Sequence, residues 1–144
     1  MKVLLAVDGS RYSEAALEAM VTQRNPRDTE VLVTHVVAPI SVTPPPQMAA
    51  GYTPELQNQV EEAEKLVERC AKRLREAGFR AATEVRKGDV REEIIDAAAK
   101  WGADKIVLGS HGRSGIQWLL LGSVAEFVAR HAKCSVEIVR NRTA

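Results

Sequence analysis

The chain of 144 residues is 45% hydrophobic but only 4% aromatic, and its 20 basic and 19 acidic residues leave a formal net charge of +1. This length fits one domain spanning residues 1–144 with an aliphatic core, and the balanced charge argues against a nucleic-acid binder with a basic face. The two cysteines match neither a metal site nor a disulfide framework, and every apolar run is too short for a signal peptide or a membrane span. We therefore expect a soluble cytoplasmic protein without nucleic-acid or membrane partners.

The first part of the chain alternates apolar runs with turn signals. Residues 2–7 form a nearly continuous apolar run that predicts a central strand, and Gly9 or Ser10 can cap the helix that follows. Residues 30–37 are rich in β-branched side chains and predict a second strand. Residues 38–53 contain a run of three prolines and predict a long surface loop. This loop is either a flap or partner surface near a ligand cleft, or a variable segment without a role.

A long amphipathic helix is predicted after this loop, with Thr53 as its N-cap and Gly78 at its end. Apolar residues recur within it in alternating steps of four and three, which is typical of a helix that covers a sheet. The apolar stripe consists of Leu56, Val60, Ala63, Val67, Cys70, Leu74 and Ala77. Because Cys70 lies inside this stripe, we expect it to be a core residue and not a redox centre.

The second part of the chain continues the alternation of strand and helix. Residues 79–86 alternate polar and apolar side chains and predict an edge strand, whereas Asp89 can cap a helix that ends at Gly102. The remaining predicted elements are a buried strand at 106–108, a helix at 123–131 and a strand at 135–139. Because a helix follows each strand, the pattern predicts a parallel, doubly wound α/β sheet.

A glycine-spaced loop directly follows the buried strand. Two residues separate Gly109 from Gly112, and nine further residues lead to Gly122 and the hydroxyl residue Ser123, where a helical pattern starts. Glycines permit positive φ or a close approach of ligand to backbone, and the unpaired N–H groups of a helix start attract anions. The order of strand, loop and helix therefore predicts a phosphate cradle.

This motif resembles the nucleotide-binding motif of the universal stress protein family, in the ATP-binding branch that keeps the glycines and the Ser/Thr. The resemblance extends to Asp8 after the first strand, Val36 at the end of the second, and the turn Gly88-Asp89-Val90. It implies a single Rossmann-like domain similar to the adenine nucleotide α-hydrolases, with a five-stranded parallel sheet of order 3-2-1-4-5 and helices on both faces. In such sheets the ligand binds beyond the carboxyl ends of strands one and four, where the strand order reverses.

The resemblance also implies which residues contact ATP. Backbone N–H groups of the loop and the helix start would hold the phosphates, and the ribose and adenine would lie toward strands one and two. The expected nucleotide-binding residues are Ala6, Asp8, Val36, Gly109, Ser110, His111, Gly112, Arg113, Ser114, Gly122, Ser123, Val124 and Ala125. A Mg or Mn ion bound through the phosphates, with Asp8 as a contact, is a further option.

Several of these residues also have a purely structural interpretation. His111 is either a hydrogen-bond donor to phosphate or an ordinary loop histidine, and Arg113 is either a cation for the phosphates or a solvated charge. Asp8 either contacts the ligand or only caps the first helix. The glycines alone would also suit a tight loop, but their spacing before a helix start favours nucleotide binding.

No catalytic constellation is evident, because the sequence lacks a Walker lysine loop, a HExxH metal site and a nucleophile elbow. The leading hypothesis is an ATP-binding switch or sensor of the stress response, in which nucleotide biases the loop conformation and the affinity for protein partners. One alternative is a slow ATPase or nucleotidyl-transfer enzyme of the α-hydrolase type. Another is an interaction module that binds no nucleotide. We assign neither catalytic nor metal-ligating residues.

The last predicted strand, residues 135–139, is expected to form a homodimer. In the universal stress protein family this strand pairs across a two-fold axis. Here it carries an alternating apolar face and an otherwise unpaired edge that needs protection.

Overall fold

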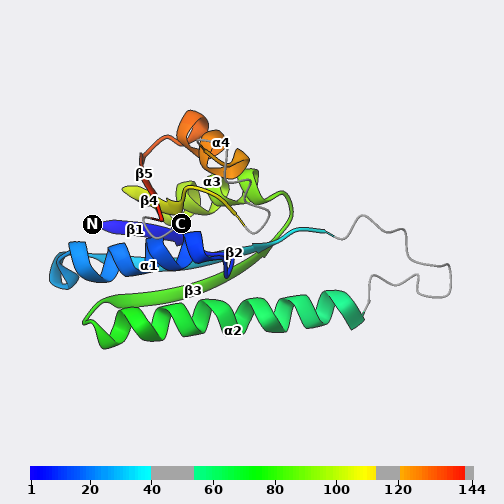
Figure 1. Ribbon diagram of the computed structural model, residues 1–144, viewed down its shortest axis with the longest axis horizontal. Helices are drawn as coiled ribbons and strands as arrows, with labels where there is room; N and C mark the ends of the chain where they lie inside the picture. The colour runs from blue at the N-terminus through cyan, green and yellow to red at the C-terminus, as the bar shows by residue number, and fades with distance from the viewer. Residues whose placement is uncertain (40–53, 113–120, 142–144) are drawn as a thin grey trace, which may run out of the picture.

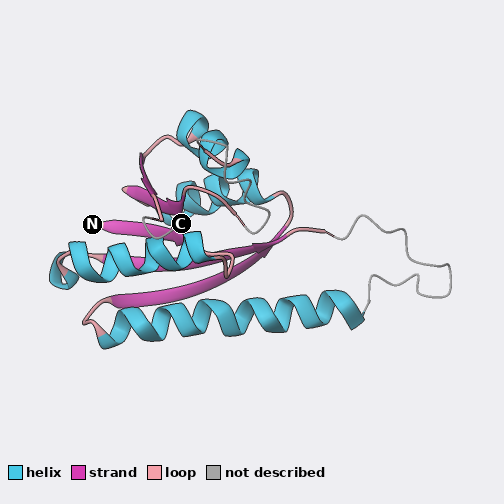
Figure 2. Ribbon diagram, viewed as in Figure 1, coloured by secondary structure: helices cyan, strands magenta, loops and turns pink. Residues whose placement is uncertain are grey.

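The computed structural model describes residues 1–39, 54–112 and 121–141, in which strands and helices alternate along the chain (Figures 1 and 2). The strands are β1 (Lys2–Ala6), β2 (Glu30–Val37), β3 (Arg80–Lys87), β4 (Lys105–Gly109) and β5 (Ser135–Val139). The helices are α1 (Arg11–Gln23), α2 (Pro54–Glu76), α3 (Val90–Trp101) and α4 (Ser123–His131), with a short 3-10 turn at Pro26–Asp28. Each predicted strand and helix is present, and most bounds agree within two residues.

The strands form one parallel sheet in the order β3-β2-β1-β4-β5, which confirms the implied α/β topology. β1 pairs with β2 on one side and with β4 on the other, so the direction of chain progression reverses between β1 and β4. β3 lies at an edge of the sheet, as its alternating sequence predicted. The carboxyl ends of β1 and β4 are therefore neighbours at the position where open α/β sheets bind ligands.

Helices cover both faces of the sheet, with α1 and α2 on one face and α3 and α4 on the other (Figure 1). Successive residues of a strand point to opposite faces, so β1 supplies both core clusters. Val3 and Leu5 pack in the cluster under α1 and α2, whereas Leu4 packs in the cluster under α3 and α4. This double burial explains why the central strands are continuous apolar runs.

The apolar stripe of α2 faces the sheet as predicted. Ala63, Val67, Cys70 and Leu74 are all buried, and the last three pack with residues of β2 and α1 in one core cluster. Burial raises the pKa of the Cys70 thiol to about 11, so the thiol is protonated at neutral pH. These properties agree with a packing role for Cys70.

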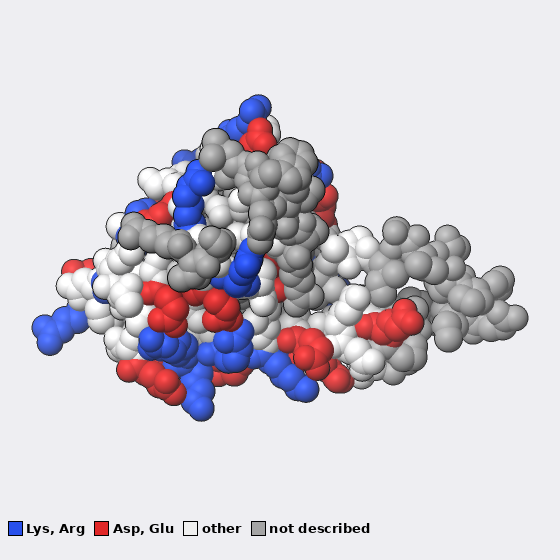
Figure 3. Space-filling view, viewed as in Figure 1, with Lys and Arg blue, Asp and Glu red and all other residues white. Residues whose placement is uncertain are grey.

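Charged side chains pair across the outer surface of α1 and α2, where acidic and basic patches lie side by side (Figure 3). Glu14 lies 2.5 Å from Arg69, and Glu18 lies 3.2 Å from Arg73. All four side chains remain partly exposed, so each pair adds at most about 1 kcal/mol of stability. The pairs link the two helices at the protein surface.

The predicted surface loop lies almost entirely outside the described residues, as do Thr53, Arg113 and Ser114. Among the residues that are described, no helix has the length and apolarity needed to cross a membrane.

Candidate functional site

A cleft of about 990 Å³ opens beyond the carboxyl ends of the central strands. A cavity of this size can enclose a nucleotide, since ligand pockets usually measure about 300–1,000 Å³. The ends of β1, β2 and β4 contribute its floor, and α2, α3 and α4 contribute its sides. Its lining consists of Ala6, Val7, Asp8, Ser13, Thr34, His35, Val36, Val37, Ala38, Asn58, Gln59, Glu62, Ala63, Leu66, Val90, Ile94, Leu108, Gly109, His111, Gly112, Gly122, Ser123, Val124 and Ala125.

Most of the residues predicted to bind nucleotide line this cleft, although they come from distant parts of the sequence. These are Ala6, Asp8, Val36, Gly109, His111, Gly112, Gly122, Ser123, Val124 and Ala125. Ser110 is buried and is not part of the lining. Its carbonyl oxygen instead accepts a hydrogen bond from the Gly122 N–H at 2.7 Å. The predictions for Arg113 and Ser114 concern residues outside the described ranges.

The motif glycines allow close packing within the protein itself. A Cβ on Gly109 would lie 2.6 Å from the backbone carbon and oxygen of Tyr12 in α1. A Cβ on Gly122 would lie 3.0 Å from the His111 Cα, and one on Gly112 would lie 3.2 Å from an Asp8 carboxylate oxygen. None of these three glycines has a positive φ, so none of them adopts the left-handed backbone conformation that glycine permits. The space for a side chain is smallest at Gly109, where the neighbouring atoms belong to the backbone.

The start of α4 presents backbone donors to the cleft. The first intrahelical hydrogen bond runs from the Glu126 N–H to the Gly122 carbonyl, so the N–H groups of Ser123, Val124 and Ala125 lie before the regular helical pattern. Gly122 is the N-cap and has no side chain with which to accept from them. In contrast, the Ser10 hydroxyl accepts from α1, and the Asp89 carboxylate accepts from α3. The α4 start can thus receive an anion in the place of a capping side chain.

Asp8 shapes the turn before the first helix, but the N-cap of that helix is Ser10 and not Asp8. The Asp8 Oδ1 accepts from the Ser10 N–H at 2.9 Å, which shapes the turn between β1 and α1. The Asp8 N–H also lies 3.3 Å from the Ser13 hydroxyl oxygen. Its other carboxylate oxygen faces Gly112 on the rim of the cleft. The turn therefore positions this carboxylate beside the motif loop.

His111 is oriented by two neighbours. Its ring packs at 45° against Tyr12, with the ring centroids 5.0 Å apart, and its Nδ1 lies 3.0 Å from the Ser110 hydroxyl oxygen. The side chain lines the cleft in this orientation.

Sequence reasoning missed the contribution of α2 and the polar residues of β2. Asn58, Gln59 and Glu62 on the first turns of α2 line the cleft, although they follow a long loop that obscures their position. His35 also lines it, and its Nδ1 lies 2.6 Å from the Val7 carbonyl oxygen. Because that oxygen can only accept, Nδ1 carries the hydrogen. Thr34 and His35 are polar side chains inside an otherwise apolar strand. This departure from the apolar pattern is the feature of the sequence that could have identified them as cleft residues.

The cleft has one polar end and one apolar end. Backbone N–H groups gather at α4, whereas aliphatic side chains of β1, β2 and α3 line the part of the cleft on the far side of β1 from β4. The aliphatic residues on that side are Ala6, Val36, Val90 and Ile94. Such a cleft can hold a molecule with an anionic group at one end and a flat apolar ring at the other.

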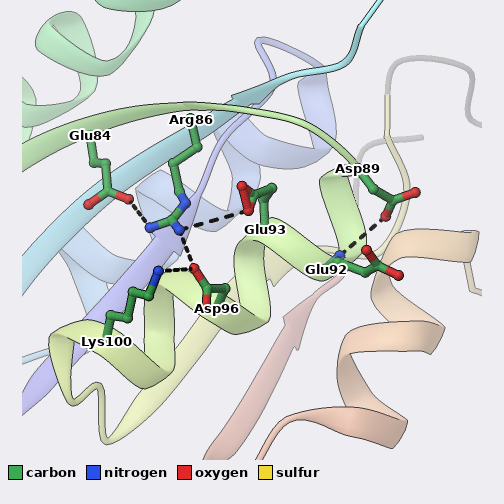
Figure 4. A network of polar contacts seen from close by, with 7 residues as sticks. All are labelled: Glu84, Arg86, Asp89, Glu92, Glu93, Asp96 and Lys100. Carbon is green, nitrogen blue, oxygen red and sulfur yellow. Dashed lines mark hydrogen bonds and ion pairs between the residues drawn. The ribbon is translucent and has the colours of Figure 1, made fainter.

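A charged network links α3 to β3 (Figure 4). The Arg86 guanidinium on β3 contacts Glu84 at 2.7 Å and Glu93 at 3.8 Å, and it also pairs with Asp96. The Lys100 ammonium first, and Arg86 to a smaller extent, hold the pKa of Asp96 below its ordinary value. The network thus links β3 to α3, whose residues Val90 and Ile94 line the cleft.

The described residues contain no group of three or more His, Cys, Asp or Glu side chains arranged to hold a metal ion.

The family model of the universal stress proteins matches residues 1–140. The chain belongs to the universal stress protein family. Universal stress protein YxiE of Bacillus subtilis is 34% identical over 145 residues, which cover 96% of this chain and 98% of YxiE. The family assignment thus extends over nearly the entire sequence.

Solved universal stress protein structures share the fold. The structure of MJ0577 from Methanocaldococcus jannaschii superposes with a TM-score of 0.86 at 30% identity, covering 99% of this chain and 97% of that chain. A family member from Arabidopsis thaliana with AMP bound superposes with a TM-score of 0.72 at 22% identity, covering 99% and 93%. The parallel sheet with its switch point between β1 and β4 is thus a property shared with these proteins.

Proposed function

We propose that this universal stress protein binds ATP in the cleft and acts as a nucleotide-dependent switch. The observation that carries the proposal is the start of α4, where Ser123, Val124 and Ala125 line the cleft before the regular helical hydrogen bonds begin. Phosphate oxygens would accept from these N–H groups and would gain from the helix dipole. The aliphatic end of the same cleft would receive the adenine ring. The AMP-bound relative supports an adenine nucleotide as the ligand class.

A Mg or Mn ion would accompany ATP through its phosphates. Asp8 is the acidic side chain at the end of β1, and one of its carboxylate oxygens faces Gly112 beside the proposed phosphate site. Such a carboxylate can accept a hydrogen bond from a metal-bound water or from the ribose. We expect Mg²⁺ to strengthen ATP binding and to have a smaller effect on AMP.

The switch would act through the motif loop. The hydrogen bond from Gly122 N–H to Ser110 O joins the two ends of the segment between β4 and α4. A ligand that contacts both Gly112 and Ser123 would therefore bridge these two ends and would favour one position of the α4 start relative to the end of β4. A protein partner that recognises that arrangement would bind the nucleotide-loaded form more tightly.

A negative charge at the start of α4 tests the phosphate site without enlarging the loop. Ser123 is exposed and begins the helix, so Ser123→Asp should preserve or slightly increase helix stability, because aspartate is favourable in a first turn. The same charge would repel phosphate, and we expect ATP affinity in isothermal titration calorimetry to fall about tenfold or more.

Two control variants separate charge from position. Ala129→Asp adds the same charge to an exposed site near the other end of α4 and should bind ATP like the wild type. Ser123→Ala removes only the hydroxyl and should lose much less affinity than Ser123→Asp. A wild-type protein without measurable affinity for ATP with Mg²⁺, or equal affinities of the two aspartate variants, would contradict the proposal.

We also propose that β5 forms a homodimer through its outer edge. β5 is the last strand of the sheet and pairs with β4 on one side only. The Ser110 N–H donates to the Val139 carbonyl at 3.0 Å, so Ser135, Glu137 and Val139 direct their backbone groups toward β4. The intervening residues Val136 and Ile138 then direct theirs toward the opposite edge, where a second copy would pair.

A further inference from the structure

Thr34 is a buried residue of β2 whose hydroxyl group has no hydrogen-bond partner among the described residues. Its side chain is 1% exposed, and Oγ1 is the only buried side-chain oxygen or nitrogen in the described part of the chain for which no partner exists. The backbone around it is satisfied, since the Thr34 carbonyl accepts from the Val7 N–H at 2.9 Å. The hydroxyl alone is therefore left without a partner.

An unpaired buried hydroxyl lowers the stability of a folded protein by about 1–3 kcal/mol. Valine has nearly the same shape and the same β-branched preference for strands, and it would avoid this loss. The neighbouring residues Val31, Val33, Val36 and Val37 show that β2 accommodates valine readily. A threonine at this position has no explanation from the packing of the sheet.

The position of Thr34 in the cleft supplies an explanation. Side chains alternate along β2, so Thr34 points to the same face as Leu32 and Val36, the face covered by α3 and α4. Thr34 pairs in register with Ala6 of β1 and lines the cleft together with it. The side chain thus belongs to the apolar end of the cleft.

The distance from the α4 start identifies the part of a nucleotide that would reach Thr34. β1 lies between β2 and β4, so Thr34 is two strand spacings, about 10 Å, from the line of β4. The loop and helix that would hold phosphate follow β4. In a nucleotide whose phosphates occupy that end, the group furthest from the phosphates is the base.

We propose that the Thr34 hydroxyl hydrogen-bonds the purine base of the bound nucleotide. This inference rests on the proposed binding of ATP in the cleft. The hydroxyl both donates and accepts, and rotation about the Thr34 Cα–Cβ bond exchanges it with the methyl group that occupies an equivalent position. Turning the hydroxyl toward the base satisfies a group that has no partner without ligand, so the hydrogen bond favours the nucleotide-loaded form.

Thr34→Val tests this role because it removes the hydroxyl and keeps the shape. We expect the ligand-free variant to melt at a higher temperature than the wild type, since an unpaired polar group has been removed. We expect its ATP affinity, measured by calorimetry with Mg²⁺, to fall about three- to tenfold. Thr34→Ser keeps the hydroxyl and should bind ATP more tightly than Thr34→Val.

Inorganic tripolyphosphate provides the matched ligand, because it has the phosphates of ATP but no base. Thr34→Val should bind tripolyphosphate like the wild type. Wild-type affinity of Thr34→Val for ATP would overturn the inference and leave ATP binding intact. Equal losses for ATP and tripolyphosphate would also overturn it, because they would indicate a general change of the cleft. A wild-type protein that binds no ATP would overturn the proposed function itself.

Discussion

The replacement of Gly109 by alanine tests how the motif loop is held against the first helix. An added Cβ would lie 2.6 Å from both the carbonyl carbon and the carbonyl oxygen of Tyr12. Ordinary contacts between such atoms are about 3.5–4.0 Å, so the overlap is about 1 Å. The atoms that the added Cβ would contact belong to the backbone, and a change of side-chain rotamer cannot move them. β4 and α1 would have to separate at the mouth of the cleft.

Gly102→Ala provides a control, because alanine at this position is disfavoured by the backbone conformation and not by a steric clash. The φ of Gly102 is +76°, and an added Cβ would have no other atom within 4 Å. The loss of stability in Gly102→Ala therefore comes from the backbone conformation alone. In a left-handed backbone conformation, alanine is less stable than glycine by about 1 kcal/mol. Overpacking against rigid backbone costs up to about 3 kcal/mol. We therefore expect Gly109→Ala to destabilise the fold by about 2 kcal/mol more than Gly102→Ala does.

Urea unfolding followed by circular dichroism measures both values. The slope of the unfolding free energy against urea concentration should be the same in each variant as in the wild type. The urea concentration at the unfolding midpoint then reports the stability directly. Gly109→Ala should also weaken ATP binding, because displacement of β4 moves His111 and Gly112, whereas Gly102→Ala should leave the affinity unchanged. A Gly109→Ala variant as stable as Gly102→Ala would refute the packing explanation and would favour ligand approach as the reason for glycine.

Arg86→Met should destabilise the protein by about 1 kcal/mol at neutral pH, because it leaves Glu84, Glu93 and Asp96 close together without their shared cation. Arg86 lowers the pKa of Asp96, although to a smaller extent than Lys100 does, so the contribution of Arg86 is present while Asp96 is ionised and is lost as the pH falls through the folded-state pKa of Asp96. The difference between Arg86→Met and wild type in urea should therefore shrink toward pH 3, and a constant difference would contradict the electrostatic explanation. Val136→Pro should convert a dimer into a folded monomer in sedimentation velocity experiments, since it removes an edge donor while sparing the β4 ladder. An unchanged dimer would show that the interface lies elsewhere.

The secondary structure was largely predictable because local signals and burial agree. β1 and β4 are short apolar runs, and both lie in the centre of the sheet, where both faces are covered. Asp89 and Gly102 delimit α3 through a side-chain cap and a left-handed C-cap, which are local signals. The strand order could not be predicted from local signals, because a helical crossover does not determine on which side of β1 the next strand is added. The resemblance to a family supplied that order.

The site was predictable where it depends on a motif and hidden where it depends on packing. The glycine spacing located the start of α4, but the reason for Gly109 is the backbone of Tyr12, which lies far away in sequence. Asn58 and Gln59 line the cleft because the first turns of α2 lie beside it, which no local pattern specifies. Thr34 is an ordinary β-branched strand residue in the sequence, and its unpaired hydroxyl is evident only in three dimensions.

The two ends of the cleft would respond differently to substitution in the proposed complex. At the α4 end the donors are backbone N–H groups, so a side-chain change there acts through sterics or charge and affects every phosphate-bearing ligand alike. At the β2 end, recognition depends on side chains such as Thr34 and Val36, so single substitutions can change the preferred base and leave phosphate binding intact. Ligand specificity in this protein is therefore expected to reside in β2 and the first turn of α3, and general nucleotide affinity in the loop after β4.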